Sequence, residues 1–151
     1  MAWPKRQLRG DELREVQQAS YLLHRMAERQ QAYYAACAAE FELTAAQAKV
    51  LMSLQPGEAA PMRALAERIG SDPSNLTGLI DKLEGRDAIR RVPDAVDRRV
   101  KTLQLTEDGL ALRHAFWQRL THDAGPIAAL TPEQVRQLRE LLAAALDPPN
   151  S

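Results

Sequence analysis

The sequence predicts a mainly α-helical protein with one small β-hairpin, in the order α-α-α-α-β-β-α-α. Over most of the chain, apolar residues recur at the three- and four-residue steps of an amphipathic helix. Residues 89–92 and 100–105 differ, because they alternate, are rich in β-branched residues and flank the polar turn PDAVDRR. The length of 151 residues and the apolar content of 45% favour a single domain, residues 1–151, with its own core.

Local start and stop signals define the first two helices. Residues 11–39 contain no Pro or Gly and are rich in good helix formers, which predicts one long helix. Thr44 stands three residues before Gln47, the spacing of a capping box. A second helix is therefore expected to begin there and to stop at Pro56-Gly57.

Two short helices follow, separated by a tight turn. The first covers residues 62–69, with Pro61 in its first turn and Gly70 as a left-handed cap. Asp72 can cap the next helix, and Pro73 suits its first position. The chain is thus expected to restart a helix immediately after the turn.

Two more helices are expected after the hairpin. Thr106 caps the first of them, which the Gly125-Pro126 pair interrupts. Thr131 and Gln134 form a second capping box, which begins a last helix that ends before Asp147. This last helix has a wide apolar stripe, which can cover its own core or pack against a second copy of the chain.

Two short helices, a tight turn and a hairpin describe a winged helix-turn-helix over residues 62–106. In this arrangement the second short helix enters the major groove of DNA. At about 100° per residue, its Leu and Ile side chains gather on one side and leave a small hydrogen-bonding face opposite. That face and its flank hold Ser74, Asn75, Thr77, Gly78, Asp81 and Lys82. Such side chains suit phosphates and base edges, although an ordinary solvated helix face would have the same pattern.

The hairpin adds a second indication of DNA binding. Between residues 86 and 101, six basic residues stand against three acidic ones, a local charge of +3. The whole chain has 20 basic and 20 acidic residues, so its affinity for nucleic acid must come from such a local surface. A solvated charged turn is the alternative, but the position directly after the two helices favours DNA.

The stretches SDPSNLTGLIDKLEGRDAIRR and DRRVKTLQLTEDG resemble the MarR family of bacterial regulators. The family pattern combines a Ser/Thr-rich recognition helix with an Asp-x-Arg wing that runs into Leu-Thr-x-x-Gly. Asp97, Arg99, Leu105, Thr106 and Gly109 match the wing motif at the expected spacing. The flanking helices also fall where the family has them, so the resemblance extends over nearly the whole chain.

The resemblance implies a homodimeric transcriptional regulator, expected to be a repressor, that binds double-stranded DNA at a palindromic operator. The winged lobe would cover residues of about 44–106, and the helices of about 11–39 and 107–147 would form the dimer. Arg99 would insert into the minor groove, Asp97 would orient it by a charge-assisted hydrogen bond, and Arg98 would approach the backbone. Asp81 is expected to pair with a nearby arginine. The alternative is a winged-helix module that binds another protein and has lost DNA binding.

The resemblance also implies a switch, because many such regulators release DNA when a small aromatic ligand binds or a thiol is oxidised. The candidate ligand-lining residues are Tyr21, His24, Tyr33, Met52, Phe116 and Trp117. Side chains of this kind more often serve core or dimer packing. Cys37, the only cysteine, lies near the end of the first helix rather than at its start, which favours a packed residue over a redox sensor.

Other classes of protein find little support in the sequence. His24, His114 and His122 do not form an i, i+4 pair, so no metal is expected. The chain has no Gly-rich phosphate loop, nucleophile elbow or clustered carboxylate pair, so neither an enzyme nor a cofactor is expected. No apolar run of about 20 residues and no signal-peptide stretch is present, so the expectation is a soluble cytoplasmic protein without membrane contact.

Overall fold

The computed structural model describes residues 7, 9–94 and 97–146, which fall into two compact units. The first unit joins the chain up to Tyr33 with the chain from Pro126 onward, and the second is Tyr34–Gly125. Helix α1, Gly10–Ala39, begins in the first unit and ends in the second. The lobe predicted at about 44–106 lies inside the second unit, which also takes in the end of α1 and the helix after the hairpin.

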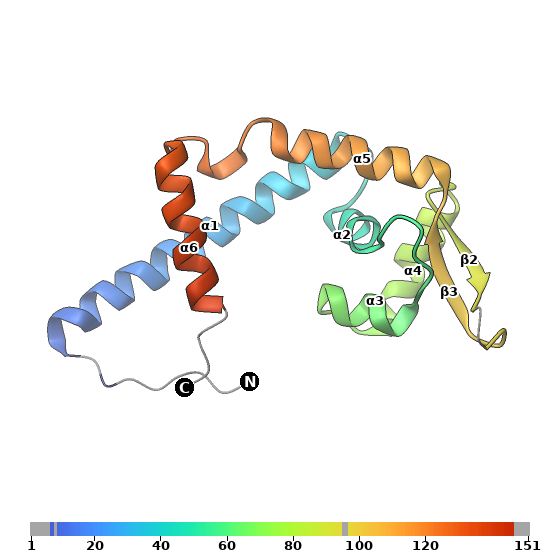
Figure 1. Cartoon of the computed structure of the whole chain (residues 1–151), viewed down its shortest axis with the longest axis horizontal. Coiled ribbons are helices and arrows are strands. Elements are labelled where there is room, and N and C mark those ends of the chain that lie inside the picture. The colour runs from blue at the N-terminus through green and yellow to red at the C-terminus, as the bar shows by residue number, and fades with distance from the viewer. Residues whose placement is uncertain (1–6, 8, 95–96, 147–151) are drawn as a thin grey trace. The chain divides into compact units, whose positions relative to one another are not determined.

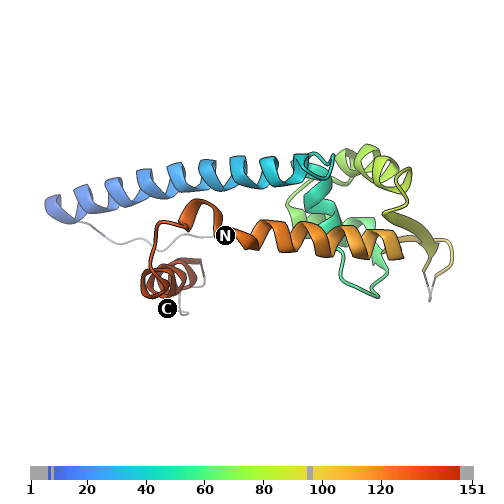
Figure 2. The same ribbon diagram turned by 90° about the horizontal axis from the view of Figure 1, so that it is seen from above.

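Four helices and a small sheet build the second unit together with the end of α1 (Figure 1). The helices are α2 (Ala45–Ser53), α3 (Met62–Ile69), α4 (Pro73–Glu84) and α5 (Glu107–His122). The strands are β1 (Ala60–Pro61), β2 (Ile89–Pro93) and β3 (Lys101–Leu105), in the antiparallel order β1-β3-β2. Figures 1 and 2 both place the β2–β3 hairpin at the edge of this lobe, next to α4.

The sheet differs from the predicted hairpin by one strand. Ala60 pairs with Leu103 and Pro61 with Thr102, so β1 adds a two-residue edge to β3. Pro61 tolerates this position because an edge strand needs no N–H donor on its outer side. Pro61 is the N-cap residue of α3 and not part of its first turn, so the prediction for this residue was wrong by one position.

The predicted capping signals are confirmed. Thr44 and Gln47 exchange the two bonds of a capping box, with 2.8 Å from the Thr44 N–H to Gln47 Oε1. Gly70 ends α3 with a φ of 65°, in the left-handed region. The Asp72 carboxylate accepts from the Ser74 N–H at 2.8 Å and caps α4. These bonds satisfy N–H groups that have no partner within a helix, and so fix where each helix begins.

The core of the second unit lies between the helices and the inner face of the sheet. Its largest fully buried side chains include Leu51, Leu65, Leu76, Ile80, Leu83, Leu103 and Phe116. The Phe116 ring packs edge-on against Tyr34 and Phe41, with ring centroids 5.2 and 5.9 Å away. Phe116 was predicted to line a ligand site, and its role here is core packing. Cys37 is also fully buried, as expected for a packed residue.

The Leu-Thr-x-x-Gly motif joins the base of the hairpin to α5. Thr106 Oγ1 accepts from the Gly109 N–H at 2.9 Å and donates to the Asp87 carbonyl. The Thr106 N–H donates to the Ala88 carbonyl at 3.2 Å. A Cβ built on Gly109 would lie 1.8 Å from that same carbonyl oxygen. Only glycine therefore permits the first turn of α5 to pack this closely on the chain that leaves α4.

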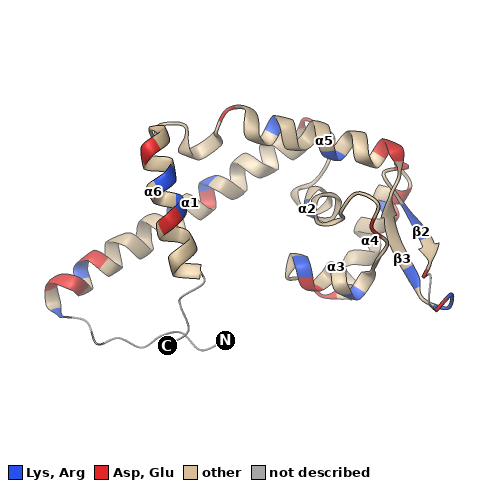
Figure 3. Cartoon of the chain, in the orientation of Figure 1, with Lys and Arg blue, Asp and Glu red and all other residues tan. Residues whose placement is uncertain are grey.

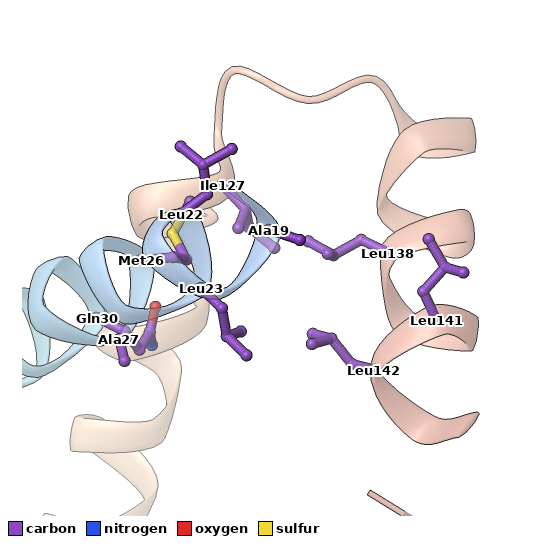
Figure 4. A pocket seen from close by; sticks show the side chains of 10 residues that line it. All are labelled: Ala19, Leu22, Leu23, Met26, Ala27, Gln30, Ile127, Leu138, Leu141 and Leu142. Atoms are coloured by element: carbon purple, nitrogen blue, oxygen red, sulfur yellow. The ribbon is translucent and has the colours of Figure 1, made fainter. Parts of the chain in front are cut away.

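The first unit contains most of α1 and the helix α6, Pro132–Leu146, with a 3₁₀ turn, Gly125–Ile127, at its boundary. None of its described residues is buried. Apolar side chains of α1 and α6 face one another across a cavity of about 620 Å³ (Figure 4), where Gln30 is the only polar residue of the lining. The predicted end of the last helix, at residues 147–149, lies outside the described residues. Within the described part of the chain, no helix has the length and apolar character needed to cross a membrane.

Candidate nucleic-acid interface

Helix α4 presents the polar face that the sequence predicted. Leu76, Ile80 and Leu83 are buried, and their burial fixes the rotation of the helix. The predicted contact residues of this helix all lie exposed: Ser74, Asn75, Thr77, Gly78 and Lys82. Nothing lies within 4 Å of a Cβ built on Gly78, so the surface is open at this point.

Ser74 is less free than the other polar residues of this face. Its hydroxyl donates to Asp72 Oδ1 at 2.6 Å, and its backbone N–H donates to the same oxygen. These bonds hold the pKa of Asp72 below its usual range. The Ser74 hydroxyl therefore offers lone pairs rather than a proton to a ligand, whereas phosphate oxygens need donors. Of the two predicted contacts of Ser74, a hydrogen-bond donor on a base edge in the major groove therefore suits this hydroxyl better than a phosphate.

Backbone bonds organise the turn at the end of the hairpin. The Arg99 N–H donates to Asp97 Oδ1 at 3.0 Å, and the Asp97 N–H donates to Asp94 Oδ1 at 3.0 Å. The backbones of Asp94 and Val100 are joined by a further bond of 2.9 Å. Asp97 was expected to orient the Arg99 side chain by a charge-assisted bond, but the donor in this structure is the Arg99 backbone. Residues 95 and 96 of the predicted turn lie outside the described residues.

The hairpin carries Lys and Arg on both strands and at the turn (Figure 3). Arg98, Arg99 and Lys101 are exposed, and no described residue forms an ion pair or hydrogen bond with their side chains. These three side chains, here called the wing cations, remain available for phosphate or the minor groove.

The other three basic residues of the hairpin region have partners within the chain. Arg86 donates to the carbonyls of Glu42 and Phe41 at 2.7 and 3.0 Å. Arg90 donates to Gln104. Arg86 and Arg90 keep their positive charge, but these bonds use part of their donors within the chain.

Arg91 pairs with Asp81 and Glu84 of α4. The distance from Arg91 Nη2 to Asp81 Oδ1 is 2.6 Å. The predicted pairing of Asp81 with a nearby arginine is thus confirmed.

The predicted ligand-lining residues are divided between the two units. In the first unit, Tyr21 accepts a hydrogen bond from Arg25 and His24 lies 3.5 Å from Glu28, both on the exposed surface, while Tyr33 is half-buried. In the second unit, Phe116 belongs to the core and Trp117 is exposed.

Met52 lines a cavity of about 390 Å³ in the second unit. The other lining residues, which sequence analysis missed, are Tyr34, Lys49, Ser53, Arg68 and Ile69. They come from three different helices, so no periodic pattern in the sequence joins them.

Comparisons with known proteins agree with this geometry. Residues 43–101, which include α4, strand β2 and the hairpin turn, match the model of the MarR family. The HTH-type transcriptional regulator TtmR of Methylorubrum extorquens is 31% identical over 114 residues, which are 76% of this chain and 58% of TtmR. The chain thus spans less than two thirds of the length of this relative.

Solved structures match over more of their length. Wild-type MarR of E. coli in its apo form superposes with a TM-score of 0.75 at 25% identity, over 85% of this chain and 96% of that one. BpsR of Bordetella bronchiseptica, described in terms of the regulation of its DNA binding by 6-hydroxynicotinic acid, has a TM-score of 0.69 at 28% identity. That match covers 86% of this chain and 99% of BpsR.

Proposed function

We propose that this chain is a member of the MarR family and a sequence-specific regulator of transcription that binds double-stranded DNA as a homodimer. One observation carries the proposal. The exposed hydrogen-bonding face of α4 and the three wing cations lie on the same lobe, beside one another in sequence and structure. Proposed contacts are Ser74, Asn75, Thr77, Gly78 and Lys82 from α4, and Asp97, Arg98 and Arg99 from the hairpin.

In the proposed complex, α4 and the hairpin bind different grooves of the DNA. Helix α4 enters the major groove, where the Asn75 amide can bond to adenine in a bidentate manner and Gly78 lets the backbone come close. Arg99 enters the minor groove, while Arg98 and Lys82 neutralise phosphates. Asp97 contributes by holding the turn that carries Arg99. As a DNA-binding regulator the protein would act in the cytoplasm, beside the chromosome.

The homodimer follows from the first unit. None of its described residues is buried, although Leu22, Leu23 and Leu141 are large apolar side chains with exposed fractions of 57%, 57% and 71%. A helix pair stabilised only by exposed leucines cannot offset the conformational entropy of its residues. A second copy offers an identical apolar face and completes the core, as in isologous dimers. Two lobes at a fixed spacing would then read the two halves of a palindromic operator.

A matched pair of substitutions tests the dimer. Ala19 lines the apolar cavity of α1 and α6, whereas Ala32 lies about 220° around α1 from Ala19 at 100° per residue. Ala19→Asp is expected to shift the molar mass measured by light scattering from dimer toward monomer, and Ala32→Asp is expected to leave it unchanged. A monomeric wild-type chain, or equal behaviour of the two variants, would contradict the proposed interface.

DNA binding is tested by selecting bound sequences from a pool of random duplexes. Mobility shifts are then measured with the most enriched sequence, here called the selected duplex. Wild type should prefer the selected duplex over random duplex, and Arg99→Ala should lose most of that binding. Arg136→Ala, which removes an exposed arginine of α6, serves as the control and should bind like wild type. A wild-type chain with no saturable preference for any duplex would refute the proposed function.

Repression is the proposed mode of regulation, because a dimer on a promoter excludes RNA polymerase from the same DNA. A reporter placed behind the selected duplex should be silenced by wild type and released by Arg99→Ala. Silencing that persists in Arg99→Ala would contradict this mode, as would activation by wild type.

A small aromatic acid is the proposed effector. The cavity around Met52 is also lined by Lys49, which forms no ion pair with a described residue, and by Tyr34. Burial raises the pKa of Tyr34 to about 12, so this hydroxyl stays protonated and can donate a hydrogen bond. Lys49 would pair with the carboxylate of such a ligand, and Met52 would pack against its aromatic ring. The likeness to BpsR, whose DNA binding is described as regulated by 6-hydroxynicotinic acid, supports this class of compound.

The effector is tested with 6-hydroxynicotinic acid and its uncharged amide as probes. The acid should raise the thermal midpoint of the DNA-free protein and release the selected duplex, and the amide should do neither. Lys49→Gln should abolish both effects, while Lys101→Gln, on the hairpin, should keep the thermal shift. Equal responses of the two lysine variants would exclude this cavity as the binding site.

A further inference from the structure

Arg91 connects the two elements that carry the proposed DNA contacts. It lies on strand β2, and its guanidinium bonds to Asp81 at 2.6 Å and also to Glu84, both on α4. Its backbone N–H donates to the second Glu84 oxygen at 3.3 Å. The bond to Asp81, together with the charges of both carboxylates, raises the pKa of Arg91. One guanidinium therefore pairs with two carboxylates, offsets one of their two negative charges and ties the wing strand to the helix.

The two carboxylates stand where negative charge is least compatible with DNA. Asp81 is exposed and follows Thr77 and Gly78 by about one helical turn, so it extends the proposed reading face. Glu84 is the last residue of α4, where the carbonyl groups of the helix end already add partial negative charge. Phosphates brought to this face would meet two like charges within a Debye length of about 8 Å.

We propose that Arg91 is a positioning residue for DNA binding, which acts through Asp81 and Glu84 rather than by touching DNA. Its guanidinium offsets part of the negative charge of these carboxylates and so weakens their repulsion of the phosphates. The inference rests on the proposed DNA-binding function. It separates Arg91 from the wing cations, whose side chains have no partner among the described residues and are free to contact DNA directly.

The test measures affinity for an end-labelled random-sequence duplex and for the selected duplex, together with the thermal midpoint of each variant. Arg91→Ala leaves the two carboxylates unpaired and should weaken binding to both duplexes by roughly tenfold. Asp81→Asn with Glu84→Gln removes the acids and should bind at least as tightly as wild type. Adding Arg91→Ala to this double variant should lower the affinity for DNA by less than about threefold, because no carboxylate remains for Arg91 to offset. Arg91→Lys keeps the charge without the two-pronged bond and should lie between wild type and Arg91→Ala.

The outcomes separate the possible roles of Arg91. A direct phosphate contact predicts that Arg91→Ala costs the same with and without the acids, which would overturn the inference. A purely structural role predicts a lower thermal midpoint in Arg91→Ala and no rescue of affinity by removal of the acids, which would overturn it as well. Unchanged affinity in Arg91→Ala would overturn this inference alone. A wild-type chain that binds neither duplex would overturn the proposed function and the inference with it.

Discussion

Substitution of Gly109 by alanine tests the packing of α5 on the chain that leaves α4. The added Cβ would lie 1.8 Å from the Ala88 carbonyl oxygen, 2.7 Å from its carbonyl carbon and 3.2 Å from its Cα. Carbon and oxygen atoms seldom approach closer than about 3.3 Å. The first turn of α5 must therefore move by roughly 1.5 Å, and no side chain can rotate aside to relieve the overlap, because every atom it meets is backbone.

The cost follows from what this movement disturbs. Overpacking of this kind costs up to about 3 kcal/mol. The bonds of Thr106 to the Gly109 N–H and to the Asp87 carbonyl are strained by the same shift, which adds about 1 kcal/mol for the weakened cap. Alanine regains about 1 kcal/mol in helix propensity. The net loss is about 3 kcal/mol, which corresponds to a fall of roughly 6 to 12 °C in the thermal midpoint of a chain of this size.

The assay is urea unfolding followed by circular dichroism, at one fixed protein concentration because dimerisation shifts the apparent stability. Gly78→Ala is the matched control, since nothing lies within 4 Å of its built Cβ. It should raise the free energy of unfolding by up to about 1 kcal/mol, while weakening DNA binding at the proposed interface. If Gly109→Ala unfolds within about 0.5 kcal/mol of wild type, the close approach to Ala88 does not exist in solution.

Three further predictions concern single residues of the second unit. Ala124 has a φ of 51°, so Ala124→Gly should raise the free energy of unfolding by about 0.5 kcal/mol. Ala129 has no positive φ, so the control Ala129→Gly should lower it. A less stable Ala124→Gly than Ala129→Gly in urea unfolding would contradict the backbone geometry. Thr44→Ala should lower the free energy of unfolding by about 1 kcal/mol, and Thr44→Ser should leave it nearly unchanged. Equal losses of stability in the two variants would show that the capping box does not stabilise α2. Bonds from Arg68 and from the Gln55 N–H lower the pKa of Glu58 to about 2. The contribution of Glu58 to stability is therefore fully present above its ordinary pKa of 4.5 and lost as pH falls toward 2, so the unfolding midpoints of wild type and Glu58→Gln should converge over that range; a pH-independent difference would exclude the ion pair as its source.

Local chemistry made most of the helix boundaries predictable. The caps made by Thr44, Gly70, Asp72 and Thr106 act on backbone groups within four residues, so the sequence around each residue is enough to predict the cap. Strand β1 was not predictable in the same way. It has two residues, too few to show alternation, and it exists because Ala60 pairs with Leu103, far along the chain. The need for glycine at position 109 has the same origin, since the atoms it must avoid belong to Ala88.

The candidate site was predictable in outline, but the sequence could not show which basic side chains have partners within the chain. Helical periodicity identified the polar face of α4, because Leu76 and Ile80 set its rotation. Periodicity could not show that Arg86 reaches the carbonyls of Phe41 and Glu42, which lie 45 and 44 residues away. Aromatic residues on helices were ambiguous for a different reason: the same spacing suits a core and a ligand site. Phe116 proved to be part of the core because the rings of Tyr34 and Phe41, more than 70 residues earlier in the sequence, pack against it.

If the wing cations and the face of α4 hold DNA, the affinity for DNA must fall as the salt concentration rises. Fluorescence anisotropy of the selected duplex, titrated over a series of salt concentrations, gives a slope of log affinity against log salt of about −0.9 per phosphate contact. We expect a steep slope for wild type, a slope shallower by about 0.9 per lobe for Arg98→Ala, and a wild-type slope for Arg136→Ala. A wild-type slope near zero, or equal slopes for the two arginine variants, would contradict the proposed interface.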